Sequence, residues 1–179
     1  AAWAAVPAAI GGCWLFASLR RGIPVAEYLG LKRVPMKTLA VWCGLLVLFV
    51  VASDLLTVSL GRPVVPESMM EAYVSATIPP LLWLALIVAA PLAEETVFRG
   101  FLFKGLRHSR VGAAGAIVIP SLIWSSIHLQ YDLYGIATIF VAGLLLGLAR
   151  LRTGSLYVPL VLHGLMNLIA TVEAAWVAA

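Results

Sequence analysis

Charged residues are scarce in this chain. Of its 179 residues only 11% are Asp, Glu, Lys or Arg, whereas 63% are hydrophobic and the mean hydropathy is +1.04. A soluble globular domain has about 25% charged and about 45–50% apolar residues, so this composition excludes soluble and disordered classes and places the chain in a lipid bilayer. The formal net charge of +4 is attributed to membrane topology rather than to nucleic-acid binding, and no nucleic-acid partner is expected.

Signatures of several other chemistries are also missing. The two cysteines, Cys13 and Cys43, lie inside apolar runs, where a packing role is expected rather than a disulfide or metal site. There is no His-Glu-x-x-His motif, and Gly154-Ser155 lacks the Gly-x-Ser-x-Gly frame of a rhomboid-like serine site. Asp54 and Asp132 have no partner motif and are interpreted as structural. No internal repeat of the kind typical of transporters is visible.

Long apolar runs dominate instead. A helix needs about 20 mostly apolar residues to cross a bilayer. Six stretches qualify, approximately residues 2–19, 38–60, 80–107, 111–129, 133–150 and 156–176. They predict an all-α, polytopic transmembrane helix bundle of about six spans, a single membrane domain over residues 1–179 with its catalytic core at residues 80–176. Gly143-x-x-x-Gly147 predicts close helix packing within the monomer rather than dimerisation.

The basic residues predict which side of the membrane the loops face. With the first terminus outside and six crossings, Arg62 alone of the twelve Lys and Arg residues falls outside. The other eleven fall inside: Arg20, Arg21, Lys32, Arg33, Lys37, Arg99, Lys104, Arg107, Arg110, Arg150 and Arg152. This split follows the positive-inside rule, so both termini are predicted to face outside. The expected location is the bacterial cytoplasmic membrane.

Three ionisable groups interrupt the third apolar run. Each costs about 2.5–3.5 kcal/mol at the bilayer centre, so Glu94, Glu95 and Arg99 need mutual pairing or a polar cavity. Glu95 and Arg99 are four residues apart and are expected to pair, whereas Glu94 is rotated by about 100° and points elsewhere. We expect Glu95 and Arg99 to support the site and Glu94 to be free for chemistry; an interfacial charge cluster is the alternative. Pro91 is expected to bend this helix.

Two later spans also carry polar side chains, His128 in one and His163 with Asn167 in the other. At 1.5 Å per residue these groups can share one depth with Glu94. A carboxylate can take a proton from water while imidazole and amide groups stabilise the oxyanion. The same groups could instead hold zinc. We favour a site without a metal or cofactor and, if zinc is bound, expect Glu94, His128 and His163 as its ligands.

Three motifs on separate spans carry a family resemblance. They are Glu94-Glu95-x-x-x-Arg99, Trp124-x-x-x-His128 and His163-x-x-x-Asn167. In this order they resemble the signature motifs of the CPBP family, which comprises type II CAAX prenyl proteases and bacteriocin-processing enzymes, also called Abi proteins. The resemblance covers roughly residues 80–175, and residues 27–31 resemble the linker that precedes the family core.

The resemblance implies a division of labour in the site. Glu94 and His128 would activate the water, and His163 with Asn167 would bind the oxyanion. Trp124 stands where the family usually has phenylalanine. Relatives of both metalloprotease and glutamate type leave the catalytic type open. We expect a conical polar cavity that opens towards the cytoplasm.

The expected function is that of an intramembrane endopeptidase. Its substrate would be a peptide or a membrane-protein segment, cleaved near the cytoplasmic leaflet in contact with the lipid bilayer. The alternative is a non-catalytic membrane protein that binds a peptide, confers immunity or transports a solute. A free carboxylate with polar groups from three spans favours the enzyme.

Overall fold

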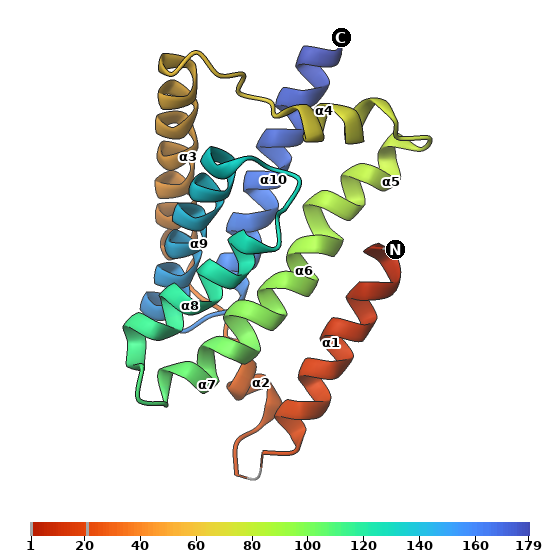
Figure 1. The fold of residues 1–179 in the computed structure, drawn as a ribbon. Coiled ribbons are helices and arrows are strands. Elements are labelled where there is room, and N and C mark those ends of the chain that lie inside the picture. Colours follow the sequence, from red (N-terminus) through yellow and green to blue (C-terminus); the bar gives the residue numbers. More distant parts are fainter. Residues whose placement is uncertain (1, 21) are drawn as a thin grey trace.

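A computed structural model describes residues 2–20 and 22–179 of the chain (Figure 1). These residues form helices joined by short connections, and none of them is in a β-strand, which confirms the predicted all-α class. In chain order the elements are α1 (Ala2–Ser18), α2 (Val25–Leu29), α3 (Met36–Ser59), α4 (Glu67–Val74), α5 (Pro79–Leu84), the π-helix η1 (Ala85–Ala89), α6 (Ala90–Glu95), the π-helix η2 (Thr96–Leu102), α7 (Phe103–Arg107), α8 (Gly112–Ser126), α9 (Leu133–Thr153) and α10 (Tyr157–Ala178).

Four helical segments are long and apolar enough to cross a membrane. They are α3, the continuous helix Pro79–Arg107 that runs from α5 to α7, α9 and α10. Within the described residues, Val6–Ser18 of α1 and the whole of α8 are apolar but shorter. The chain is therefore an integral membrane protein by its helices, and the count of six spans stays a prediction. Because α8 ends at Ser126, His128 lies just beyond a helix rather than inside one.

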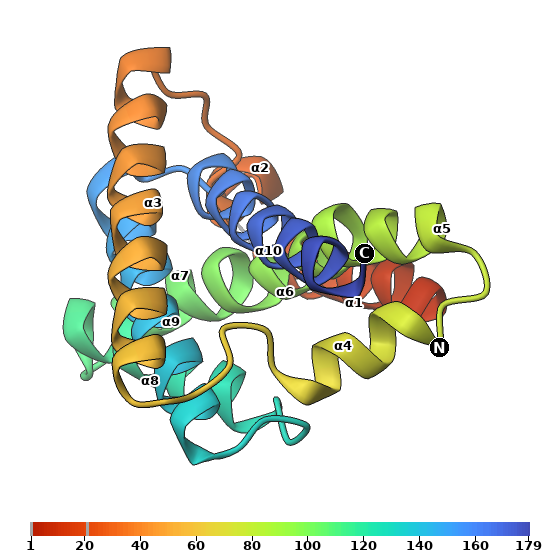
Figure 2. The same cartoon turned by 90° about the horizontal axis from the view of Figure 1, so that it is seen from above.

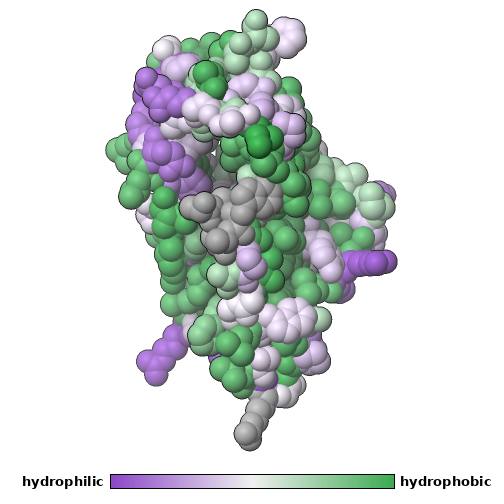
Figure 3. Space-filling view, turned by 90° about the vertical axis from the view of Figure 1, so that its right-hand side faces the viewer, coloured by the Kyte–Doolittle hydropathy of each residue, from purple (hydrophilic) through white to green (hydrophobic). Residues whose placement is uncertain are grey.

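Large apolar side chains cover the outside of the bundle. On α3 they include Leu48, Leu55 and Val58, whose exposed fractions are 65%, 67% and 60%. Surfaces of this kind suit lipid rather than water. Figure 3 shows one face of the molecule, on which apolar residues predominate and hydrophilic residues gather near the end that carries α4 and the C-terminus.

The bundle has two ends, which the rest of the description uses (Figure 1). The basic end comprises the end of α1, α2, the connection 30–35, the turn 108–111 and the connection 154–156. The cavity end comprises the connection 60–66, α4, the connection 127–132 and the C-terminal part of α10. An ion pair between Arg62 and Asp132 joins the two connections at the cavity end. Arg21, predicted to face the cytoplasm, lies outside the described residues.

Helix α10 is the centre of the bundle. Seen from above, it runs between α3 and the Pro79–Arg107 helix (Figure 2). Its fully buried Val158 and Leu162 belong to a core cluster with Leu46, Trp124 and Leu146, which come from α3, α8 and α9. Every site residue predicted from the sequence therefore lies on, or directly beyond, a helix that packs around this core.

Glycine allows α9 to approach α8 closely. A Cβ atom added at Gly143 would lie 2.9 Å from the Cβ of Ser121, and one at Gly147 would lie 3.0 Å from Cγ2 of Ile117. These contacts confirm the predicted close helix packing within the chain, and the preference over dimerisation stays a prediction. The space at Gly143 also admits the guanidinium of Arg99, whose Nη2 atom donates a hydrogen bond to the Gly143 carbonyl at 3.2 Å.

Arg150 fastens the segment after α2 to the core. Its buried guanidinium donates from Nε to the Arg99 carbonyl at 2.8 Å and from Nη2 to the Leu29 carbonyl at 3.3 Å. Gly30 has φ 77°, and its carbonyl accepts a hydrogen bond of 2.8 Å from the backbone N–H of Leu156. The predicted linker at residues 27–31 is thus an integral part of the bundle.

Gly30→Ala should destabilise the protein more than Gly112→Ala. Both glycines have positive φ, so alanine costs about 1–2 kcal/mol at either position. At Gly30 the new Cβ would also lie 2.1 Å from Nη2 of Arg150, whereas nothing lies within 4 Å at Gly112. Overpacking adds about 1–3 kcal/mol. Thermal unfolding in detergent measures the difference; equal losses in the two variants would show that Arg150 moves aside freely.

Candidate functional site

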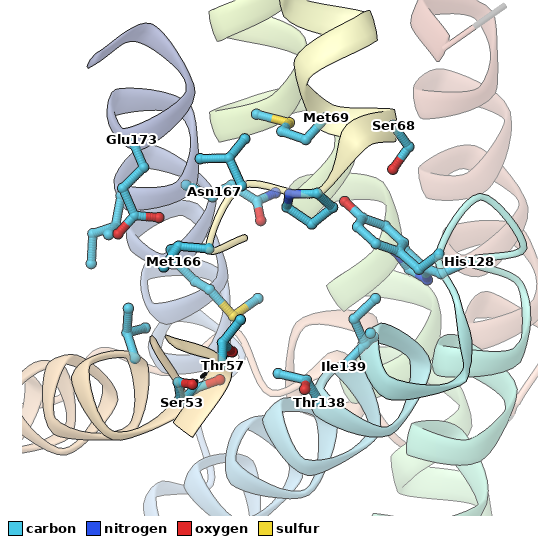
Figure 4. A pocket seen from close by; sticks show the side chains of 18 of the residues that line it. Ser53, Thr57, Ser68, Met69, His128, Thr138, Ile139, Met166, Asn167 and Glu173 are labelled. Carbon is cyan, nitrogen blue, oxygen red and sulfur yellow. Dashed lines mark hydrogen bonds between the residues drawn. The ribbon is translucent and has the colours of Figure 1, made fainter. Parts of the chain in front are cut away.

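A cavity of about 680 Å³ lies at the cavity end of the bundle. Figure 4 shows that its wall is shared by α3, α4, α9 and α10, with His128 and Asn167 among the side chains that face it. Glu94 and His163 line it as well. The structure thus brings together the four residues predicted to carry the chemistry. Glu95 and Arg99, predicted to support them, lie buried outside the cavity lining.

Arg99 is the most deeply buried cation of the described residues. Its side chain is 1% exposed, and its Nη1 atom donates to Oε1 of the fully buried Glu95 at 2.8 Å. The Trp124 ring lies against the guanidinium, with 4.7 Å between Cζ and the ring centroid. Removing a guanidinium and a carboxylate from water costs several kcal/mol each, and only close pairing offsets this cost. The predicted Glu95–Arg99 pair is confirmed.

Glu95 also orients His163. The same Oε1 atom lies 2.9 Å from Nδ1 of His163, which is 3% exposed. Since an ionised carboxylate can only accept, Nδ1 is the donor, and Nε2 is left facing the cavity. Nε2 lies 4.0 Å from Oε2 of Glu94. The imidazole is therefore held between a buried carboxylate and one that lines the cavity.

Trp124 holds the second carboxylate. Its indole Nε1 donates a hydrogen bond to Oε2 of Glu94, and its ring is 1% exposed. The ring also makes edge contacts with both imidazoles, at centroid distances of 5.3 Å to His128 and 5.1 Å to His163. A phenylalanine at this position could not donate to Glu94. Trp124 was predicted only as an aromatic motif residue, so this role was missed; the available signal was that the N–H of a buried indole needs an acceptor.

His128 offers a free nitrogen to the cavity. Its Nδ1 atom lies 2.7 Å from the Trp124 carbonyl, which can only accept, so Nδ1 carries the hydrogen. In the neutral ring Nε2 is then an acceptor. Tyr131 packs beside the ring at a centroid distance of 6.2 Å, and burial raises the pKa of its phenol, which keeps the phenol protonated.

The side chain of Asn167 supplies a hydrogen bond that is missing from the backbone of the helix Pro79–Arg107. The N–H of Ala90 reaches back five residues to the Ala85 carbonyl, and the next such bond would run from Pro91 to Leu86. Proline has no N–H, so the Leu86 carbonyl lacks a helical partner, and the Asn167 side chain donates to it at 2.8 Å. The irregularity expected at Pro91 thus takes the form of the π-helix η1 in a continuous helix. The second amide hydrogen of Asn167 is left for the cavity.

Two half-buried acidic residues of the cavity lining were missed as such. Asp54 of α3 and Glu173 of α10 both line it, and both are half-buried. Asp54 was interpreted as structural because it has no partner motif, and nothing in the sequence places α3 beside α10. Asp132 is structural as predicted: its carboxylate caps α9 by accepting from the N–H of Gly135 at 2.9 Å, and it pairs with Arg62.

The residues named as zinc ligands do not fit a metal in this arrangement. Among the described residues, no three His, Cys, Asp or Glu side chains lie close enough together to hold an ion. No chemistry is therefore derived through a metal.

Comparison with known proteins assigns the family. The family model described as type II CAAX prenyl endopeptidase Rce1-like matches residues 76–169. The chain belongs to this family. The matched region contains all three motifs, so the resemblance seen in the sequence is confirmed. It does not include Asp54 or Glu173, which complete the cavity wall.

A protein of Escherichia coli is also similar to this chain. Described as an uncharacterized 24.3 kDa protein, it is 34% identical over 125 residues, which are 67% of this chain. The match covers 57% of that relative's length. No solved structure matches the chain.

Glu95→Ala should destabilise the protein more than Glu94→Ala. It leaves Arg99 buried without its anion, a loss of about 3–5 kcal/mol, and releases His163 as well. Glu94 is the matched control, because its side chain is 27% exposed and does not pair with Arg99. Thermal unfolding of both variants tests this. Arg99→Met should recover part of the Glu95→Ala loss; no recovery at all would contradict the pairing argument.

Proposed function

We propose that the protein is an intramembrane endopeptidase that hydrolyses peptide bonds with a water molecule activated by Glu94. The observation that carries the proposal is the pairing of a cavity-lining carboxylate with an imidazole that a second, buried carboxylate orients. Membership of the Rce1-like endopeptidase family supports it. The substrate is a peptide or a segment of a membrane protein, since the cavity of about 680 Å³ is large enough to admit part of an extended chain.

Glu94 acts as the general base. The 4.0 Å between its Oε2 atom and Nε2 of His163 is too long for a direct hydrogen bond, and one water can contact both atoms. The indole of Trp124 keeps the carboxylate in place. Nε2 of His128 accepts a hydrogen bond from the same water or from the substrate. Glu94 takes one proton as the water oxygen attacks the carbonyl carbon.

The polar groups around Glu94 stabilise the resulting oxyanion. His163 donates from Nε2 when its ring is protonated, and Glu95 at Nδ1 stabilises that charged ring. Asn167 contributes the amide hydrogen that the Leu86 carbonyl does not use. Glu94 then returns its proton to the leaving nitrogen as the C–N bond breaks, so the products are a carboxylic acid and an amine. The reaction as proposed uses residues of this chain and water alone.

The proposed setting is a bundle of six spans. The four helices that meet the length requirement form most of the cavity wall, and α8, which carries Trp124, is packed tightly against α9. In this setting lipid surrounds the exposed apolar side chains of the helices.

Glu94→Gln should abolish cleavage without loss of folding. Glutamine has nearly the same shape but cannot take a proton from water. The purified protein is offered a library of membrane-associated peptides, and products are measured by mass spectrometry. Glu27→Gln on α2 is the matched control, because Glu27 is exposed at the basic end and should leave turnover unchanged. Peptide binding without cleavage by the unmodified protein would favour the non-catalytic alternative.

Chelators should leave activity intact. The proposed reaction requires no metal, so active protein is expected to contain far less than one zinc per chain by elemental analysis. Stoichiometric zinc, with activity lost on chelation and restored by zinc, would overturn the metal-free proposal and recast Glu94, His128 and His163 as ligands. Glu94→Gln would be inactive under either mechanism, so the metal measurement decides between them.

A further inference from the structure

The two ends of the bundle differ strongly in charge. Exposed basic residues gather at the basic end: Arg20, Lys32, Arg33, Lys37, Arg107, Arg110 and Arg152. In the described part of the chain Arg62 is the one basic residue of the cavity end, and Asp132 neutralises it. Carboxylates gather at the cavity end: Asp54, Glu67, Glu71, Asp132 and Glu173.

This separation indicates how the bundle sits in the membrane. Lys and Arg in short loops near the ends of spans are retained on the cytoplasmic side, where anionic lipids also attract them. The basic residues lie in the connections 19–35, 108–111 and 154–156 or within a few residues of them, and these are all short. This indication comes from where the residues lie in the folded bundle and does not depend on the number of spans. It places the basic end in the cytoplasm.

The site is closed towards the basic end. Below Glu94 the bundle is filled by Phe98, Arg99 and Leu146, which are 7%, 1% and 0% exposed. Further towards the basic end, the guanidinium of Arg150 fills the space between the helices and donates hydrogen bonds to the Arg99 and Leu29 carbonyls. Towards the other end, the cavity continues from Glu94 past Asn167 and Thr138 to the exposed rim at Gln130 and Arg62.

We infer that the cavity opens on the face of the membrane opposite the cytoplasm, and that the substrate enters from that face. The second half of this inference rests on the proposed function. The expected cytoplasmic opening and the expected cytoplasmic location of the basic residues cannot both hold in this structure, because the cavity and the basic residues lie at opposite ends. The charge distribution decides for the outward opening. The substrate is therefore a peptide or protein segment that reaches the outer side of the membrane before it is cut.

Thiol labelling in sealed cells tests the orientation. Ser75→Cys, after α4 at the cavity end, and Ser109→Cys, at the basic end, form a matched pair, since both serines are exposed. They are introduced singly into protein whose Cys13 and Cys43 are alanine, after thermal unfolding has confirmed its fold. A membrane-impermeant maleimide is expected to label Ser75→Cys in sealed spheroplasts and Ser109→Cys only after permeabilisation. The reverse pattern, or labelling of both in sealed spheroplasts, would overturn the inference.

A third variant tests the opening of the cavity itself. Thr138 lines the cavity below the rim and is half-buried. A small charged methanethiosulfonate should modify Thr138→Cys in sealed spheroplasts, from the same side as Ser75→Cys. Failure to do so, or modification only after permeabilisation, would contradict an outward opening.

The labelling results do not depend on catalysis. An inactive protein with the expected labelling would overturn the proposed function but keep the orientation of the cavity. For active protein in proteoliposomes of known orientation, a water-soluble peptide should be cut only when the cavity end faces the added peptide. Cleavage from the basic side alone would overturn the inference while the endopeptidase proposal stands.

Discussion

Burial of the Arg99 guanidinium in an apolar bundle is the constraint on which the site depends. The cation needs an anion, a carbonyl and a polarisable surface, and it obtains them from Glu95, Gly143 and Trp124. These partners come from α6, α9 and α8, so the charge joins three helices at one point. Two of these partners also contact the residues proposed to carry the chemistry: Glu95 orients His163, and Trp124 donates a hydrogen bond to Glu94. Structural support and proposed chemistry therefore share the same atoms.

Two adjacent glutamates thereby acquire different properties. Glu95 is fully buried and its Oε1 atom bonds to both Arg99 and His163, whereas the Glu94 side chain is 27% exposed and faces the cavity. Consecutive residues on a helix point about 100° apart, so only one of the pair can face the cavity while the other faces the core. The π-helical turns on either side of the pair change the local helical rotation, and Asn167 satisfies the carbonyl that the first turn leaves free.

The cavity and the basic residues occupy opposite ends of the bundle. The core cluster around Leu146 and Leu162 lies between them, so the cavity is closed towards the basic end. A family resemblance alone implies a cytoplasmic opening, whereas the loop charges of this chain imply the other face. Charge distribution is a property of each individual chain, and members of one fold family can differ in it.

Several features of the fold and of the site could be predicted from composition and from the spacing of residues along the sequence. Composition and apolar runs predicted an all-helical membrane domain, the four-residue interval predicted the Glu95–Arg99 pair, and three motifs predicted which residues share a site, because helix geometry converts spacing directly into position. Contacts between helices were decided only by tertiary structure: the His163–Glu95 bond, the Trp124–Glu94 bond and the approach of Asp54 and Glu173 to one cavity. Apolar periodicity in a chain surrounded by lipid leaves the rotation and depth of each helix undetermined, because lipid tails solvate an apolar face as well as another helix does.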